Sequence, residues 1–168
     1  MSEILKASEN QIPAIIALAK RTWYATYSSL VPLEQIAYML DMFYSEQLLR
    51  EQMNDSKHHF LVLIEGDELL GYSHCIELDD KVKLSKLYFA PEQQGKGLGK
   101  LLMSAIEDET RSIGFSLIEL CVNRGNAAQY FYEKMGFKVI ESKDFPIGNY
   151  WMNDFVMQKV IAWNSRYW

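Results

Sequence analysis

The chain has 168 residues, of which 49% are hydrophobic and 23% are charged, and its formal net charge is −5. This composition excludes a disordered chain and predicts one domain, residues 1–168, with a sizeable core. The negative charge makes nucleic acid a poor partner and suits a cationic substrate better.

Compartment is indicated by what the sequence lacks. No apolar run approaches the roughly 18 residues that a membrane span requires, and the N-terminus shows no signal peptide. The two cysteines, Cys75 and Cys121, lie in apolar, strand-like runs outside any metal or redox motif. We therefore expect two reduced core cysteines, no metal site, no membrane contact and a cytoplasmic protein.

The first third of the chain predicts one strand and three helices. The expected bounds are residues 3–7 for the strand and residues 8–27, 32–43 and 45–53 for the helices. Ser8 and Gln11 have the spacing of a capping box, and Ser45 is suited to cap the third helix.

The rest of the chain mixes hairpin signals with crossover helices. We expect strands at 60–64, 69–78, 82–89, 116–122, 137–141 and 154–161, helices at about 98–113 and 126–135, and a loop at 142–153. Such a mixture predicts an α/β (α+β mixed) fold, in which a mixed central sheet carries helices on both faces.

A glycine-rich turn joins the strand at 82–89 to the amphipathic helix after it, in the segment YFAPEQQGKGLGK (residues 88–100). The first turn of a helix has backbone N–H groups without partners and carries partial positive charge. Three glycines let a ligand approach this backbone, and two lysines add charge. The segment therefore predicts phosphate or pyrophosphate binding. These residues are Gly95, Gly97, Gly99, Lys96 and Lys100.

Three motifs compete for this turn. The nucleotide P-loop is absent, because Lys100 stands where that motif requires its second glycine. The dinucleotide fingerprint G-x-G-x-x-G is one residue short. The segment Gln94–Gly99 matches the acyl-CoA pyrophosphate loop Q/R-x-x-G-x-G/A at every fixed position. A glycine turn that only caps the helix remains an alternative.

A second segment, NAAQYFYEKMGF from Asn126 to Phe137, follows at a distance of one helix and one strand. With the glycine turn, it resembles the GNAT N-acetyltransferases, most closely the PaiA-type polyamine acetyltransferases. The resemblance implies a GNAT fold with a mostly antiparallel sheet. It also implies an N-acetyltransferase that moves an acetyl group from acetyl-CoA to a primary amine. An acyl-CoA-binding regulatory module with little catalysis is the alternative.

The resemblance also assigns residues to acetyl-CoA. In such folds the strands on either side of the glycine loop and its helix diverge, and the pantetheine arm pairs with the first strand in the gap. Asn126 contacts this arm or caps its helix, and Tyr132 matches the proton donor of the family, with a core tyrosine like Tyr130 as the alternative. The other residues implied to bind acetyl-CoA are Leu87, Tyr88, Phe89, Gln94, Gly95, Lys96, Gly97, Leu98, Gly99 and Lys100.

The general base has no obvious counterpart in this sequence. Many relatives carry a glutamate where Ser85 stands here. If the preceding turn is tight, His74 shares the face of Ser85 and Leu87 and acts as the base, either directly or through water. A histidine packed within the sheet is the alternative.

Aromatic and acidic residues gather in the second helix and the C-terminal strands, and this combination suits a cation. We expect the acceptor to be a small-molecule amine, such as a polyamine or diamine. The aromatic tail residues Trp163, Tyr167 and Trp168 either dock on the fold or form a homodimer contact. The expected acceptor-binding residues are Tyr27, Glu34, Tyr38, Asp41, Tyr150 and Asp154.

Overall fold

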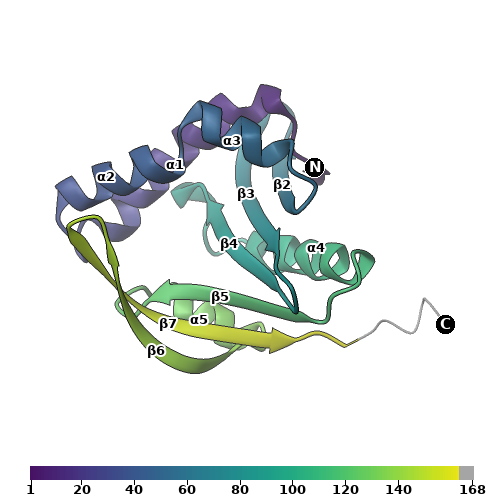
Figure 1. The fold of residues 1–168 in the computed structure, drawn as a ribbon. Coiled ribbons are helices and arrows are strands. Elements are labelled where there is room, and N and C mark those ends of the chain that lie inside the picture. Colours follow the sequence, from purple (N-terminus) through teal and green to yellow (C-terminus); the bar gives the residue numbers. More distant parts are fainter. Residues whose placement is uncertain (163–168) are drawn as a thin grey trace.

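The computed structural model describes residues 1–162 and shows a mixed seven-stranded sheet with helices on both faces (Figure 1). The strand order is β1-β2-β3-β4-β5-β7-β6, and β4 and β5 pair in parallel while the other neighbours are antiparallel. The strands are β1 Ser2–Lys6, β2 His58–Glu65, β3 Glu68–Glu77, β4 Val82–Phe89, β5 Leu117–Asn123, β6 Lys138–Ile147 and β7 Tyr150–Val160.

The helices follow the apolar periodicity of the sequence. They are α1 Ile12–Tyr27, α2 Leu33–Phe43, α3 Glu46–Met53, α4 Leu98–Ser112 and α5 Ala128–Lys134. Two of the predicted caps form: the backbone N–H of Ser8 donates to Gln11 Oε1 at 2.9 Å, and Ser45 Oγ accepts the N–H of Leu48 at 3.1 Å. Each cap satisfies a backbone group that a helix start would otherwise leave free.

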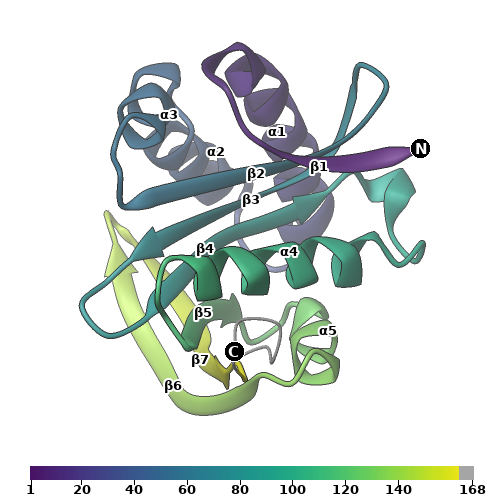
Figure 2. The ribbon, with the colours of Figure 1, turned by 90° about the vertical axis from the view of Figure 1, so that its right-hand side faces the viewer.

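Two apolar cores lie on the two faces of the sheet. Helices α1, α2 and α3 pack on one face, where Trp23 and Ile36 meet Tyr72. Helices α4 and α5 pack on the other face, where Ile106 meets Leu120. Figure 2 shows α4 and α5 in front of the sheet and α1 to α3 behind it.

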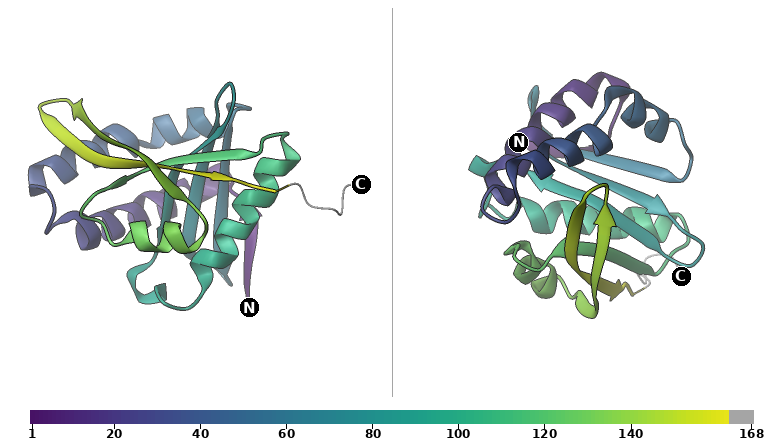
Figure 3. Two further views of the ribbon diagram at one scale, coloured as in Figure 1. Left: turned by 90° about the horizontal axis from the view of Figure 1, so that it is seen from below. Right: turned by 60° about the vertical axis from the view of Figure 1, so that its left-hand side comes forward.

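The prediction of a loop at 142–153 is wrong, because β6 and β7 continue through it as a long hairpin. Gly148, with φ +59°, opens the two-residue turn between Ile147 and Tyr150, which is a typical hairpin position for glycine. Most of β6 is exposed on both faces, so the sequence lacks the apolar alternation that marks a half-buried strand. The hairpin tip reaches α2 (Figures 1 and 3), where Gln35 Nε2 donates to the carbonyl of Trp151 at 3.1 Å.

Strand β4 carries an irregularity in the middle. His74 pairs with Lys86 and Cys75 pairs with Leu84, so Ser85 is left without a partner in β3 as a β-bulge. On its other side β4 pairs with β5 at Val82↔Ile118 and Lys83↔Glu119, and beyond these pairs the two strands diverge. This confirms the divergence that the family resemblance implies.

None of the helices within residues 1–162 is both long enough and apolar enough to cross a membrane. The tail residues for which we expect docking or a dimer contact, Trp163, Tyr167 and Trp168, lie outside the described residues.

The contact between the hairpin tip and α2 can be tested at Gly148. A Cβ there would lie 2.6 Å from Tyr38 Cζ, whereas Gly66, in the β2–β3 turn with φ +61°, has open space around its Cβ position. Both Gly→Ala variants should lose about 1–2 kcal/mol from the left-handed backbone. Gly148→Ala should lose about 1–3 kcal/mol more from overpacking against Tyr38.

Urea unfolding of both variants measures this difference. Adding Tyr38→Ala should remove the excess cost of Gly148→Ala. If the two glycine variants are equally stable, the hairpin tip does not pack on α2 as described.

Candidate active site

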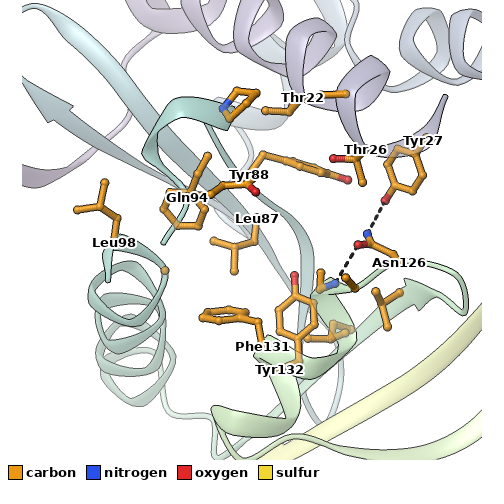
Figure 4. Close-up of a pocket in the computed structure, with 18 of the residues that line it drawn as sticks. Thr22, Thr26, Tyr27, Leu87, Tyr88, Gln94, Leu98, Asn126, Phe131 and Tyr132 are labelled. Carbon is orange, nitrogen blue, oxygen red and sulfur yellow. Dashed lines mark hydrogen bonds between the residues drawn. The ribbon is translucent and has the colours of Figure 1, made fainter. Parts of the chain in front are cut away.

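A cavity of about 830 Å³ opens where β4 and β5 diverge (Figure 4). Its walls come from both strands, from the glycine loop and the start of α4, from α5, and from the C-terminal end of α1. Segments that are far apart in the sequence therefore meet around one opening in the sheet.

The glycine loop forms one end of this cavity. Gly95 (φ +80°) and Gly97 (φ +79°) have left-handed backbones, and a Cβ at either position would meet no atom within 4 Å. Gly97 directly precedes the first turn of α4, and Lys100 lines the cavity while Lys96 Nζ lies 3.4 Å from Gln93 Oε1. Open backbone at a helix start beside lysines fits a pyrophosphate group.

Gly99 is required for a different reason. A Cβ at this position would lie 2.9 Å from Phe131 Cε2. The missing side chain therefore allows α4 to pack closely against α5, and this is a reason for Gly99 that the sequence does not reveal.

The donor strand expected from the resemblance lines the same cavity. Leu87, Tyr88 and Phe89 all contribute to its wall, beyond the last residue pair that joins β4 to β5. Since no strand of the described chain pairs with this edge of β4, its backbone groups can accept an extended ligand.

Tyr132 projects from α5 into the cavity, and Figure 4 shows its ring pointing toward Leu87. It packs edge-on against Phe131 and Phe137, with ring centroids 5.4 and 5.8 Å away. Burial raises the pKa of Tyr132 well above its usual value, so the phenol is protonated near neutral pH. Tyr130 is 65% exposed and does not line the cavity, so the structure separates the two tyrosines clearly.

Asn126 connects α5 to α1. Its Oδ1 accepts the backbone N–H of Ala128 at 2.9 Å, and its Nδ2 donates to the hydroxyl of Tyr27 at 3.5 Å (Figure 4). Asn126 thus satisfies the first N–H of α5 from the residue before the N-cap, Ala127, rather than as the cap itself, and Asn126 and Tyr27 both line the cavity.

The expectation that His74 shares the face of Ser85 and Leu87 is wrong. The bulge at Ser85 pairs His74 with Lys86, and both side chains point to the face that α1 to α3 cover, where Lys86 Nζ lies 3.4 Å from the carbonyl of Phe43 in α2. His74 is 1% exposed, stacks on Phe60 at 4.0 Å and does not line the cavity. Burial lowers the pKa of His74 to about 2, so His74 is a poor base near neutral pH.

Lys86 and His58 flank His74 in a series of three polar side chains. Lys86 Nζ lies 3.4 Å from His74 Nδ1, and His74 Nε2 lies 2.8 Å from His58 Nδ1. This series satisfies polar groups within the core between the sheet and the first three helices. Within residues 1–162 no group of three His, Cys, Asp or Glu side chains could hold a metal ion.

The expected acceptor residues are only partly brought together. Tyr27 lines the cavity, and Tyr38 of α2 packs on Tyr150 of the hairpin, with ring centroids 5.6 Å apart. Glu34 and Asp41 lie on the exposed face of α2 and do not line the cavity. Asp154 is 3% exposed, lies on β7 beside β5 and does not itself line the cavity.

Cys121 corrects a further expectation. It is exposed in the cavity wall rather than buried in the core, whereas Cys75 is buried. Its neighbours Leu120 and Val122 point into the core under α4, so strand alternation turns Cys121 to the opposite face.

Comparison with known proteins agrees with this geometry. Residues 30–157 match the model of the acetyltransferase (GNAT) domain family. An uncharacterised N-acetyltransferase of Mycobacterium bovis is 33% identical over 150 residues, which cover 88% of this chain and 96% of the relative. A spermidine N(1)-acetyltransferase of Thermoplasma acidophilum is 28% identical over 162 residues, which cover 94% and 96%.

Among solved structures, the crystal structure of the PaiA N-acetyltransferase from Thermoplasma acidophilum in complex with coenzyme A has a TM-score of 0.85 and 29% identity. The match covers 95% of this chain and 99% of that one. The chain therefore belongs to the GNAT acetyltransferase family and is an acetyl-CoA-dependent N-acetyltransferase.

Proposed function

We propose that this N-acetyltransferase acetylates a small molecule with a primary amine, and that the preferred acceptor is a diamine or polyamine. The observation that carries the transfer reaction is the cavity between β4 and β5, which collects the open glycine loop, the unpaired edge of β4 and Tyr132. These are the parts that an acyl-CoA-dependent transfer requires.

On the donor side, the loop from Gln94 to Lys100 binds the pyrophosphate of acetyl-CoA through the backbone at the start of α4. The β4 edge at Leu87–Phe89 holds the pantetheine arm as an added strand would be held. Bound acetyl-CoA supplies the acetyl group and a thiolate leaving group. Tyr132 donates its phenolic proton to that sulfur, a role supported by its position in the cavity.

On the acceptor side, support for a cation comes from charge and aromatic surface. The chain carries a net charge of −5, and Glu34 and Asp41 add exposed carboxylates on α2 beside the Tyr38–Tyr150 pair. Aromatic faces and carboxylates together attract aliphatic ammonium groups. A relative over nearly the whole length of this chain is a spermidine acetyltransferase.

The loop assignment predicts the effect of Gly97→Val. The branched side chain would occupy the space where phosphate meets the backbone, so binding of acetyl-CoA should be lost. Gly114→Val is the matched control, because Gly114 (φ +89°) lies just beyond the other end of α4 with equally open space. Both variants carry similar backbone strain, and calorimetric titration should show lost affinity in Gly97→Val alone. Equal affinity in the two would remove the loop from the site.

The assignment of the proton donor predicts a selective loss in Tyr132→Phe. General acid catalysis contributes roughly 10²–10⁴-fold, so kcat should fall within this range while acetyl-CoA affinity stays similar. Tyr130→Phe changes an exposed tyrosine of the same helix and should keep full turnover. A steady-state thiol-release assay measures both variants, and unchanged turnover in Tyr132→Phe would exclude it as the acid.

The acceptor assignment predicts faster acetylation of spermidine than of a monoamine of similar length. The preference should weaken at high salt, because exposed charges are screened. Asp41→Asn should reduce the preference for spermidine over the monoamine, whereas Asp67→Asn, in the β2–β3 turn, should leave this preference unchanged. Equal rates with monoamines, amino acids or peptide N-termini, without salt dependence, would refute the polyamine acceptor and leave the N-acetyltransferase assignment unaffected.

A further inference from the structure

Asp154 has an unusual position on β7. Its neighbour Phe155 and Met157, two residues further along β7, pack into the core beneath α4 and α5. Strand alternation therefore directs Asp154 to the opposite face. Met152 lies on the same face as Asp154 and packs against the core beneath α1 to α3.

This face continues across β5 to the cavity. Asp154 pairs with Asn123 of β5, and Val156 pairs with Cys121, which lines the cavity wall. Asp154 does not line the cavity itself, but Asp154 and Cys121 are diagonal neighbours on one face of an antiparallel pair, a spacing that side chains can bridge. The carboxyl of Asp154 therefore lies one side chain behind the cavity wall. Asp154 also contributes to the raised pKa of Tyr27, another cavity residue, through its negative charge.

The carboxyl of Asp154 is buried without being satisfied. The residue is 3% exposed, and its Oδ1 has no hydrogen-bond partner among the described residues. Arg124 does not satisfy this carboxyl, because it donates to the backbone carbonyl of Asp154 at 3.2 Å, to Ser142 Oγ at 2.9 Å and to the carboxylate of Asp144. A buried polar group without a partner costs stability, and a catalytic role is one of the reasons for which such a group is retained.

We propose that the Asp154 carboxylate is the general base that takes the proton from the attacking amine. The proposal rests on the proposed function. It supplies from β7 the carboxylate that β4 lacks, because β4 carries Ser85 where many relatives have a glutamate. In the step, a C–N bond forms to the acetyl carbon while the C–S bond breaks. Asp154 first takes one proton from the ammonium, which frees the lone pair of the nitrogen for attack. The phenolic proton of Tyr132 goes to the leaving sulfur, and the second N–H proton, which the nitrogen loses as the amide forms, restores the Tyr132 phenol. Asp154 then releases its proton to solvent.

The charged and titratable groups around Asp154 are compatible with this role. Burial is the largest influence and raises the pKa of Asp154 to about 6, while the cations of Arg124 and Lys83 oppose the rise. Lys143 pairs with Asp154 across β6, and Tyr27 and Cys121 face it from α1 and β5. The carboxylate is therefore ionised at neutral pH and more basic than a surface aspartate, as a general base should be.

The alternative role for Asp154 is a fixed negative charge that only binds the second ammonium of the acceptor. The two roles differ in what they change. A counter-charge acts mainly on KM for diamines, whereas a base acts on kcat, on its pH profile and on acceptors that must lose a proton.

Asp154→Asn separates them, with Asp108→Asn on the exposed side of α4 as the control. We expect kcat with spermidine to fall by roughly 10²–10⁴-fold. The acid limb of the wild-type profile near pH 6 should disappear, and the residual rate should rise with pH as free amine accumulates. The deficit should shrink for a hydrazine acceptor that is largely neutral at the assay pH. Affinity for coenzyme A should be unchanged, which shows that the variant is folded.

A ¹³C titration of the Asp154 carboxyl group gives a readout that does not depend on turnover. In the wild-type protein its midpoint should lie near pH 6, and the signal should be absent in Asp154→Asn. A midpoint in the ordinary aspartate range would overturn the proposal. So would a variant that keeps the wild-type pH profile and changes only KM. Absence of wild-type transfer to any amine would instead refute the proposed function itself, whatever the titration shows.

Discussion

The site depends on the short parallel pairing between β4 and β5. Two residue pairs, Val82↔Ile118 and Lys83↔Glu119, hold the strands together, and beyond them the sheet opens. The bulge at Ser85 lies directly after this point and changes which side chains of β4 face each side of the sheet. A continuous ladder here would leave no unpaired β4 edge for an extended ligand and no cavity between the two layers of helices.

The gap in the sheet also separates the two halves of the proposed chemistry. The glycine loop, α4 and Tyr132 approach from the face that α4 and α5 cover, whereas Tyr27 and Asp154 belong to the face that α1 to α3 cover. Burial raises the pKa of both titrating groups. It makes the Asp154 carboxylate more basic, and it leaves the Tyr132 phenol protonated but a weaker acid, so proton transfer from Tyr132 depends on the negative charge that develops on the leaving sulfur. In the proposed mechanism, the proton donor Tyr132 lines the opening from one face of the sheet and the proton acceptor Asp154 lies behind its wall on the other face.

Local features were predictable from the sequence, and features that depend on strand register were not. The glycine turn, its helix and β4 were all indicated by periodicity and turn residues, and the divergence of the strands came from the family resemblance. The prediction of the sheet face on which His74 lies was wrong, because a β-bulge reverses the alternation of side chains without leaving a signal in the sequence. The β6–β7 hairpin was missed because exposed β6 shows no apolar alternation, although the Gly148-Asn149 pair between the two strands was a usable signal.

The central claim is that donor and acceptor enter the gap between β4 and β5 from opposite faces of the sheet. A crystal structure with coenzyme A and spermidine bound together tests it most directly. The account predicts the pyrophosphate at Gly95 and Gly97, the sulfur beside Tyr132, and the amine nitrogen on the side of Tyr27 and Asp154. Coenzyme A bound away from the gap, or an amine that enters from the side of α4, would contradict it.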